Sequence, residues 1–348
     1  MHSAPTGQPL DFIVFGVPRS GTKALVRALN LHPHIYCAME RFHFRTDHST
    51  IAFPASFLDE SGIIDQHDLG KVRRVREEIA GKTEIRYVGN KLPRYYFALD
   101  RINHELPALK NVWIYRSPYG FMQSWNRRER ECHRGRWRPG QIGLFGLLEL
   151  LCCIDNCLRL NKDIFLFPYD AGLNRSTLPI TDTLDFLGAT PGLYDLAKFE
   201  TQYLRRRREA SHRLALQDYE EEILDVLAMK RLDAIMEEGG GRMLSAVAGS
   251  LKEYLGWIAA RLPVAIDRAF ATCDNKAATA FGLQHFRRNR AELQGVSKMA
   301  QGSEALNAFQ TFGFYQRLST LYLQRWALKR RLFSLRMPAL LRSVRGNS

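Results

Sequence analysis

Cysteine is scarce in this sequence, and the cysteines present form no recognisable framework. The 348 residues include six cysteines, without the density or regular spacing of a disulfide-stapled domain. We therefore expect reduced thiols that are mostly buried. Cys153 and Cys157 could share one helix face and bind a metal ion, but no second pair lies nearby, so packing in the core is the favoured interpretation. No metal is predicted.

Long apolar runs are also missing. Residues 1–15 contain neither a basic segment nor a long apolar stretch, which argues against a signal peptide and a membrane anchor. The most apolar later run, residues 142–158, carries Glu149 and Asp155 and is predicted to be a buried helix. The sequence therefore predicts a cytoplasmic protein, with peripheral contact at a membrane surface as the alternative.

Acidic residues are outnumbered by basic ones, and the formal net charge is +14. This charge predicts affinity for anions, but zinc-finger spacing and helix-turn-helix signatures are absent, so nucleic acid is not a predicted partner. After Glu304 the chain has no acidic residue, and from Arg317 its cations interleave with Trp326 and Phe333. Two alternatives follow for this basic segment: an amphipathic helix on an anionic membrane, or a helix packed on the core.

Strands alternate with helices in the first two hundred residues. Short apolar runs predict strands at residues 12–15, 86–88, 112–115 and 164–167. Helical patterns lie between and after them, at residues 69–80, 142–161 and 180–187. Such alternation favours an α/β fold of three layers, with a central parallel sheet between helices. We predict this core over residues 1–200 and a helical, basic C-terminal region over residues 201–348.

The segment Gly16-Val-Pro-Arg-Ser-Gly-Thr-Lys23 lies between a predicted strand and a predicted helix. Its two glycines let backbone N–H groups turn around an anion at the start of the helix. Arg19 and Lys23 add positive charge, and Ser20 and Thr22 add hydroxyl donors. In the usual triphosphate-binding loop the lysine precedes the hydroxyl residue, whereas the order here is reversed. The segment therefore predicts a P-loop-like phosphate site without the usual triphosphate machinery.

The stretch GVPRSGT resembles the 5′-phosphosulfate loop of the sulfotransferase superfamily, and it matches through Gly21 and Thr22. Lys23 stands where the family has a further hydroxyl residue. The stretch VWIYRSPYGFMQSW resembles the family's 3′-phosphate motif, with Arg116 at the end of a strand and Ser124 eight residues later. A guanidinium group offers phosphate a forked pair of donors.

The resemblance extends over about residues 11–190 and implies further site residues. The stretch FLFPYDAG resembles the family strand whose tyrosine lies at the adenine, so Tyr169 is the candidate for that contact. The implied donor is 3′-phosphoadenosine 5′-phosphosulfate, which serves as a co-substrate without a metal ion.

Sulfuryl transfer needs a base for the acceptor hydroxyl and a cation for the charge on the leaving phosphate. The stretch YCAMERFHF resembles the base region of carbohydrate-type sulfotransferases, with Met39 in place of a lysine, so the resemblance implies Glu40 as the base. His43 is the alternative, because the ordinary pKa of histidine suits this role. Lys91 in GNKLPRYYF resembles the family lysine that reaches the transferring group.

These patterns predict an enzyme that moves a sulfuryl group to a hydroxyl, or alternatively an amine, of a carbohydrate or glycolipid acceptor. A nucleotide or small-molecule kinase with a P-loop fold is a second hypothesis, although no apolar strand ends in an obvious magnesium-binding aspartate. A non-catalytic, membrane-associated protein that retains only the fold is a third.

Overall fold

The computed structural model describes residues 7–44, 46–60, 66–82, 84–130, 143–160, 162–204, 216, 218–259, 261 and 264–265. The basic segment from Arg317, for which the sequence predicts membrane contact or core packing, lies outside these residues. No helix in the described ranges combines the length and apolar character that a bilayer span requires.

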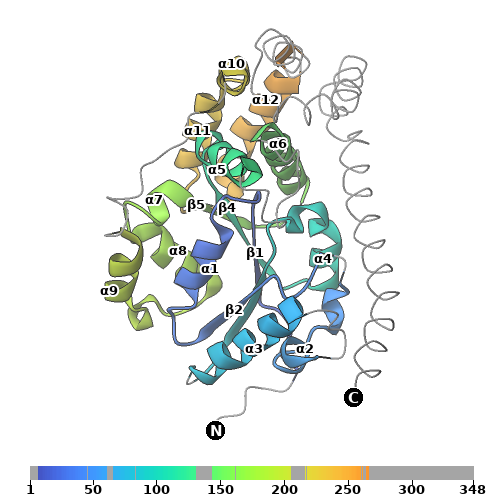
Figure 1. Ribbon diagram of the computed structural model, residues 1–348, viewed down its shortest axis with the longest axis vertical. Coiled ribbons are helices and arrows are strands. Elements are labelled where there is room, and N and C mark those ends of the chain that lie inside the picture. Colours follow the sequence, from blue (N-terminus) through green and yellow to red (C-terminus); the bar gives the residue numbers. More distant parts are fainter. Residues whose placement is uncertain are drawn as a thin grey trace, which may run out of the picture.

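One parallel sheet forms the centre of the molecule, and its strands lie in the order β2-β3-β1-β4-β5 (Figure 1). The strands are β1 (Phe12–Phe15), β2 (Ile35–Met39), β3 (Tyr87–Lys91), β4 (Lys110–Tyr115) and β5 (Ile164–Pro168). Every pairing between them is parallel. The predicted α/β fold is confirmed.

Both faces of the sheet are buried, as the central strand shows. Phe12 and Val14 pack in one apolar cluster with residues of α1 (Thr22–Leu29) and α8 (Leu178–Leu187). Ile13 and Phe15 pack in a second cluster on the opposite face, with residues of α4 (Leu99–Glu105), α5 (Pro118–Arg130) and α6 (Gly143–Arg159). Because side chains alternate across a strand, an all-apolar strand must be covered on both sides.

The remaining helices pack around the sheet and around the helices that cover it (Figure 1). They are α2 (Ala55–Leu58), α3 (Gln66–Ala80), α7 (Tyr169–Gly172), α9 (Leu196–Phe199), α10 (Asp218–Val226), α11 (Met229–Glu238) and α12 (Ala248–Ala259). The predicted helices at 69–80, 142–161 and 180–187 correspond to α3, α6 and α8. Gly188 ends α8 in a left-handed conformation with φ 82°, which glycine adopts without strain.

The helices α11 and α12 continue the core rather than stand apart from it. Leu232 and Leu251 belong to the same apolar cluster as Ile13. The backbone after α11 also bonds to the edge strand β5. Leu166 N donates to Arg242 O at 2.9 Å, and Gly241 N donates to Leu166 O at 2.9 Å. The domain boundary near residue 200 remains a prediction.

The thiols in the described part of the chain are free and buried, at Cys37, Cys152, Cys153 and Cys157. Burial raises the pKa of Cys153 well above its ordinary value, so this side chain packs as a neutral thiol. Within the described ranges, no three His, Cys, Asp or Glu side chains gather in a way that could hold a metal ion.

Candidate active site

The predicted site residues follow strands that end at the same edge of the sheet. From β1 the chain passes through α1 to β2, whereas from β4 it passes through α5 and α6 to β5 on the other side. The connections therefore diverge at the carboxyl ends of the neighbouring strands β1 and β4. In open α/β sheets, ligands bind in the crevice at such a point. The loop from Gly16 to Gly21 follows β1, and Arg116 follows β4.

The loop after β1 has no room for a side chain at either of its two glycines. Gly21 has φ 100°, and a Cβ atom there would lie 2.2 Å from Tyr169 Cδ2. A Cβ atom on Gly16 would lie 2.4 Å from Ile114 O, which is part of β4. Arg19 has φ 79°, in the left-handed region that side chains other than glycine rarely adopt. The loop therefore packs closely against Tyr169 and β4, and its left-handed residues carry the kind of backbone strain that clusters at active sites and ligand clamps.

Gly21→Ala should disturb this loop. A residue with a side chain at this backbone angle lowers the free energy of unfolding by about 1–3 kcal/mol. The added methyl group would also collide with the Tyr169 ring. We expect a lower midpoint of thermal unfolding and about tenfold weaker binding of 3′-phosphoadenosine 5′-phosphate by calorimetry, since tenfold corresponds to about 1.4 kcal/mol. Gly70→Ala is the matched control, because nothing lies within 4 Å of its added Cβ. Equal affinities in the two variants would contradict the assigned role of Gly21.

Trp125 of α5 holds the loop through a hydrogen bond that the sequence did not predict. Its indole Nε1 donates to Pro18 O at 2.7 Å, and its ring is fully buried in α5. The signal in the sequence was a tryptophan one residue after Ser124, but nothing local distinguishes it from an ordinary core residue.

Two hydroxyl groups of the loop are buried, those of Ser20 and Thr22. Ser20 is 2% exposed, and no hydrogen-bond partner for its Oγ exists among the described residues. A buried hydroxyl without a partner is unfavourable in a folded protein, so such an atom points to a ligand group that satisfies it. The Ser20 hydroxyl and the two tightly enclosed glycines therefore fit a phosphate or sulfate oxygen.

The two motifs of the resemblance meet directly, although they are far apart in the sequence. Arg19 Nε donates to Ser124 Oγ at 2.9 Å across a separation of 105 residues. Arg116 Nη1 donates to Arg19 O at 3.2 Å, and its guanidinium carbon lies 4.7 Å from the centre of the Tyr169 ring. Two guanidinium groups and a hydroxyl thus converge at one edge, which favours a polyanionic ligand.

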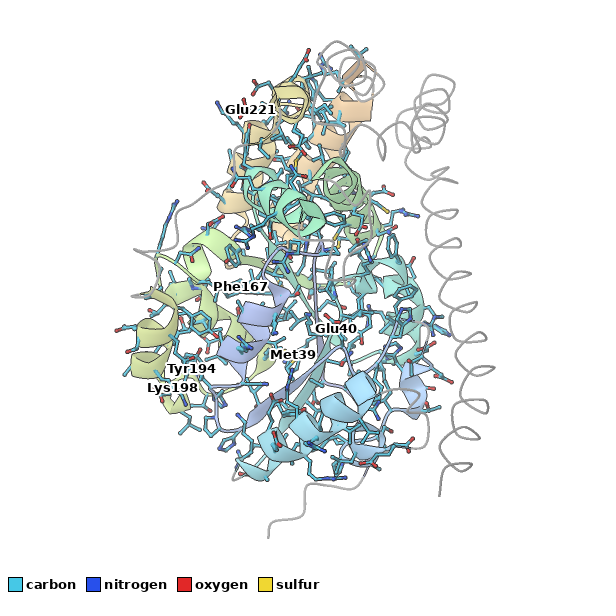
Figure 2. The ribbon with its side chains drawn as sticks, in the orientation of Figure 1. Met39, Glu40, Phe167, Tyr194, Lys198 and Glu221 are labelled. Carbon is cyan, nitrogen blue, oxygen red and sulfur yellow. The ribbon has the colours of Figure 1, made fainter. Side chains whose placement is uncertain are left out.

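Lys91 and Glu40 form an ion pair at the same edge of the sheet. Lys91 Nζ lies 2.5 Å from Glu40 Oε1, and the backbone N of Glu40 donates to Lys91 O at 2.7 Å. The pairing of β2 with β3 places Met39 opposite Lys91. Glu40 follows Met39, with φ 59°; Figure 2 labels both residues. The lysine is buried at 4% exposure, whereas the Glu40 side chain is 46% exposed. The arrangement holds a half-exposed carboxylate against a buried cation.

Lys23 is exposed in the first turn of α1 and connects the loop with this pair electrostatically. Its pKa is lowered by partial burial, and the positive charges of Arg27, Arg74 and Lys91 lower it further, whereas Glu40 raises it. Lys91 and Glu40 therefore both act on the charge of Lys23, at the start of the helix that follows the loop.

His43 lies in the segment after β2, where its ring packs against Phe44 with centroids 4.1 Å apart. Asn90, buried in β3, holds this segment by accepting from Arg41 N at 3.1 Å and donating to Phe42 O at 3.1 Å. Glu40 and His43 therefore lie on one anchored segment, and the choice of base between them remains a prediction.

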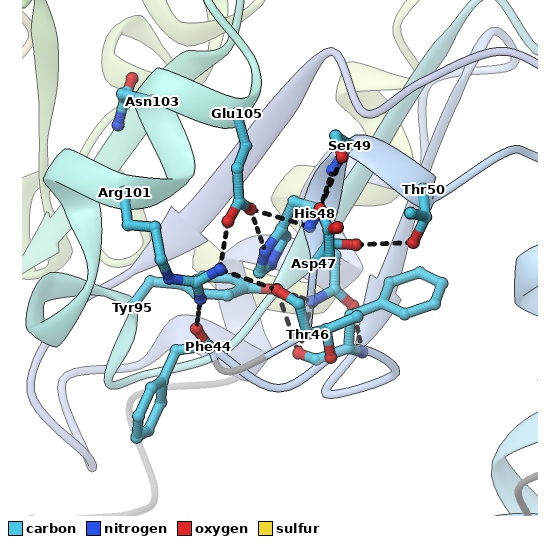
Figure 3. A network of polar contacts seen from close by, with 12 residues as sticks. Phe44, Thr46, Asp47, His48, Ser49, Thr50, Tyr95, Arg101, Asn103 and Glu105 are labelled. Atoms are coloured by element: carbon cyan, nitrogen blue, oxygen red, sulfur yellow. Dashed lines mark hydrogen bonds and ion pairs between the residues drawn. The ribbon is translucent and has the colours of Figure 1, made fainter.

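A polar network anchors the residues that follow this segment (Figure 3). Glu105 of α4 accepts from His48 N at 2.8 Å and lies 3.4 Å from His48 Nδ1. Arg101 donates to Glu105 and to the backbone oxygens of Phe44 and Thr46. Burial lowers the pKa of His48, although the Glu105 carboxylate raises it. The network thus ties the chain after Glu40 to the body of the protein.

In a comparison with known proteins, residues 11–146 match the model of the Sulfotransferase family. Three solved structures resemble the chain. A sulfotransferase from Alicyclobacillus acidocaldarius is 17% identical, with 69% of this chain and 99% of that chain covered and a TM-score of 0.42. The sulfotransferase domain from the curacin biosynthetic pathway is 15% identical, with 53% and 75% covered and a TM-score of 0.36. A sulfotransferase from Mycobacterium avium is 16% identical, with 72% and 77% covered and a TM-score of 0.38. No curated protein matches.

The matched range contains the loop after β1, the Glu40–Lys91 pair and the Arg116 motif, which are the features that carried the resemblance. Over residues 11–146, the chain is thus similar to the sulfotransferase family.

Proposed function

We propose that the protein transfers a sulfuryl group from 3′-phosphoadenosine 5′-phosphosulfate to a hydroxyl group of a carbohydrate or glycolipid, with an amine as the alternative acceptor group. The observation that carries the proposal is the contact between Arg19 and Ser124, because it joins the loop after β1 to the helix after β4. This contact brings the two proposed halves of the nucleotide site together across 105 residues of sequence.

Each group in the site has a role in this reaction. The loop and Ser20 would hold the 5′-phosphosulfate, Arg116 and Ser124 the 3′-phosphate, and Tyr169 the adenine. As the acceptor oxygen bonds to sulfur, the bond from sulfur to the phosphate oxygen breaks and the acceptor proton passes to Glu40. Lys91 would stabilise the negative charge that develops on the leaving phosphate oxygen.

The donor is tested by the effect of the 3′-phosphate on binding. A ligand that binds only the folded state stabilises it by RT ln(1 + L/Kd), where L is the free ligand concentration, so at equal concentration the tighter ligand raises the unfolding temperature more. We expect 3′-phosphoadenosine 5′-phosphate to stabilise the protein more than adenosine 5′-phosphate, which lacks only the 3′-phosphate. Arg116→Ala should weaken binding of the bisphosphate by about 10- to 100-fold, because hydrogen bonds to charged groups contribute about 1.5–3 kcal/mol, and should remove its advantage.

Arg175→Ala provides a control, because it removes a cation from the segment after α7 with no role in the proposed site. It should keep the wild-type preference for the bisphosphate. Equal stabilisation of the wild-type protein by the two nucleotides would refute the assignment of the 3′-phosphate site.

A further inference from the structure

A carboxylate from α11 contacts both chain neighbours of Arg116. Ser117 Oγ donates to Asp233 Oδ2 at 2.7 Å, and the Tyr115 hydroxyl donates to Asp233 Oδ1. These contacts span 116 and 118 residues of sequence. The two oxygens of one side chain therefore hold the side chains of the residues on either side of Arg116.

A second buried carboxylate holds the far end of the same element. Glu220 of α10 is fully buried and accepts from Asn126 Nδ2 at 2.8 and 2.7 Å through its two oxygens. Asn126 Oδ1 in turn accepts from Gly143 N at 2.8 Å. Since Asn126 lies two residues after Ser124, the stretch that carries Arg116 and Ser124 is fixed at both ends by helices from the C-terminal part of the chain.

The Arg116 side chain has little room to compensate for a shift of its backbone. Its guanidinium group lies over the Tyr169 ring, and a Cβ atom on Gly120 would come within 2.8 Å of Arg116 Nε. A forked donor binds phosphate well only when its plane and direction are set before the ligand arrives. A change in the backbone at Tyr115 or Ser117 would therefore turn the fork away from its target.

We propose that Asp233 is a positioning residue for the donor's 3′-phosphate, acting on Arg116 through Tyr115 and Ser117. The α10–α11 part of the chain, to which the sequence assigned no role, thereby completes the nucleotide site. This inference rests on the proposed function, because it assumes that Arg116 binds the 3′-phosphate.

The test compares dissociation constants of 3′-phosphoadenosine 5′-phosphate and adenosine 5′-phosphate, measured by calorimetry on the full chain. The constant for adenosine 5′-phosphate divided by the constant for 3′-phosphoadenosine 5′-phosphate isolates the contribution of the 3′-phosphate. In Asp233→Ala we expect this ratio to fall about tenfold, since small misplacements of a binding group are costly, while affinity for the monophosphate changes little. Asp233→Asn should retain more of the ratio, because hydroxyl groups can both donate to and accept from an amide. Glu238→Ala, on the exposed side of α11, should keep the wild-type ratio.

Each outcome decides for or against the role of Asp233. If Asp233→Ala weakens both nucleotides equally and keeps the ratio, its role is only structural and the inference is wrong. If Asp233→Ala fails to fold, Ser117→Ala removes one of the two contacts, and an unchanged ratio there overturns the inference in the same way.

Arg116→Ala separates this inference from the proposed function. If that variant loses the ratio while Asp233→Ala keeps it, only the positioning role fails. If Arg116→Ala keeps the wild-type ratio, the proposed 3′-phosphate site itself is wrong.

Discussion

Glu40→Gln should lower turnover by about 10²- to 10⁴-fold, the usual contribution of a general base. The amide keeps the size of the side chain and can still accept the hydrogen bond from Lys91, which lies 2.5 Å from Glu40 Oε1 in the wild-type protein. It cannot accept a proton from the acceptor. Release of 3′-phosphoadenosine 5′-phosphate from the sulfated donor, followed with a responsive acceptor, measures this loss.

Donor affinity should survive in Glu40→Gln, because the carboxylate is not among the groups proposed to hold the nucleotide. Glu60→Gln is the matched control, since Glu60 pairs with Arg76 on the surface at 3.1 Å. It should keep wild-type turnover. His43→Ala should have a milder effect than Glu40→Gln. Near-normal turnover in Glu40→Gln, with a severe loss in His43→Ala, would transfer the role of base to His43.

Lys91→Met should reduce turnover by about 10²- to 10³-fold, the effect of removing one preorganised donor from a developing negative charge. Lys91 is almost fully buried, and a cation in such a place acts more strongly than one in water. Methionine fills similar space without the charge, and the backbone bond from Glu40 N to Lys91 O remains possible. Single-turnover rates with saturating donor measure the effect on the chemical step.

Lys230 is an exposed lysine of α11, so Lys230→Met is the control for the loss of one positive charge. It should leave the rate unchanged. If Lys91→Met weakened donor binding but kept the single-turnover rate, Lys91 would bind the ground state rather than the transition state, and its assigned role would be wrong.

The candidate site residues could be named from the sequence because most of them lie at or just after the ends of strands. Gly16 and Gly21 bracket a short segment between an apolar run and a helical pattern, and the backbone angle at Gly21 requires the residue that the sequence has there. Arg116 likewise ends an apolar run. The carboxyl ends of parallel strands share one edge of a sheet, so local patterns were sufficient to collect these residues on one side of the molecule.

The contacts that orient these residues could not be predicted from the sequence. Trp125 and Asp233 look like an ordinary core residue and an ordinary helix residue in the sequence, yet one binds Pro18 O and the other binds Ser117. The pairing of Lys91 with Glu40 depends on the register of β2 against β3, in which Met39 faces Lys91. No local pattern states which strands become neighbours.

The sequence by itself determined the alternation of strands and helices, the glycine-bounded loop and the residues that supply charge to it. Only the tertiary structure decided that Lys91 reaches Glu40 across 51 residues and that Asp233 reaches Tyr115 across 118. The physical reason is that backbone angles and apolar spacing are set by near neighbours, whereas these polar contacts form only after strand order and helix packing bring distant segments together.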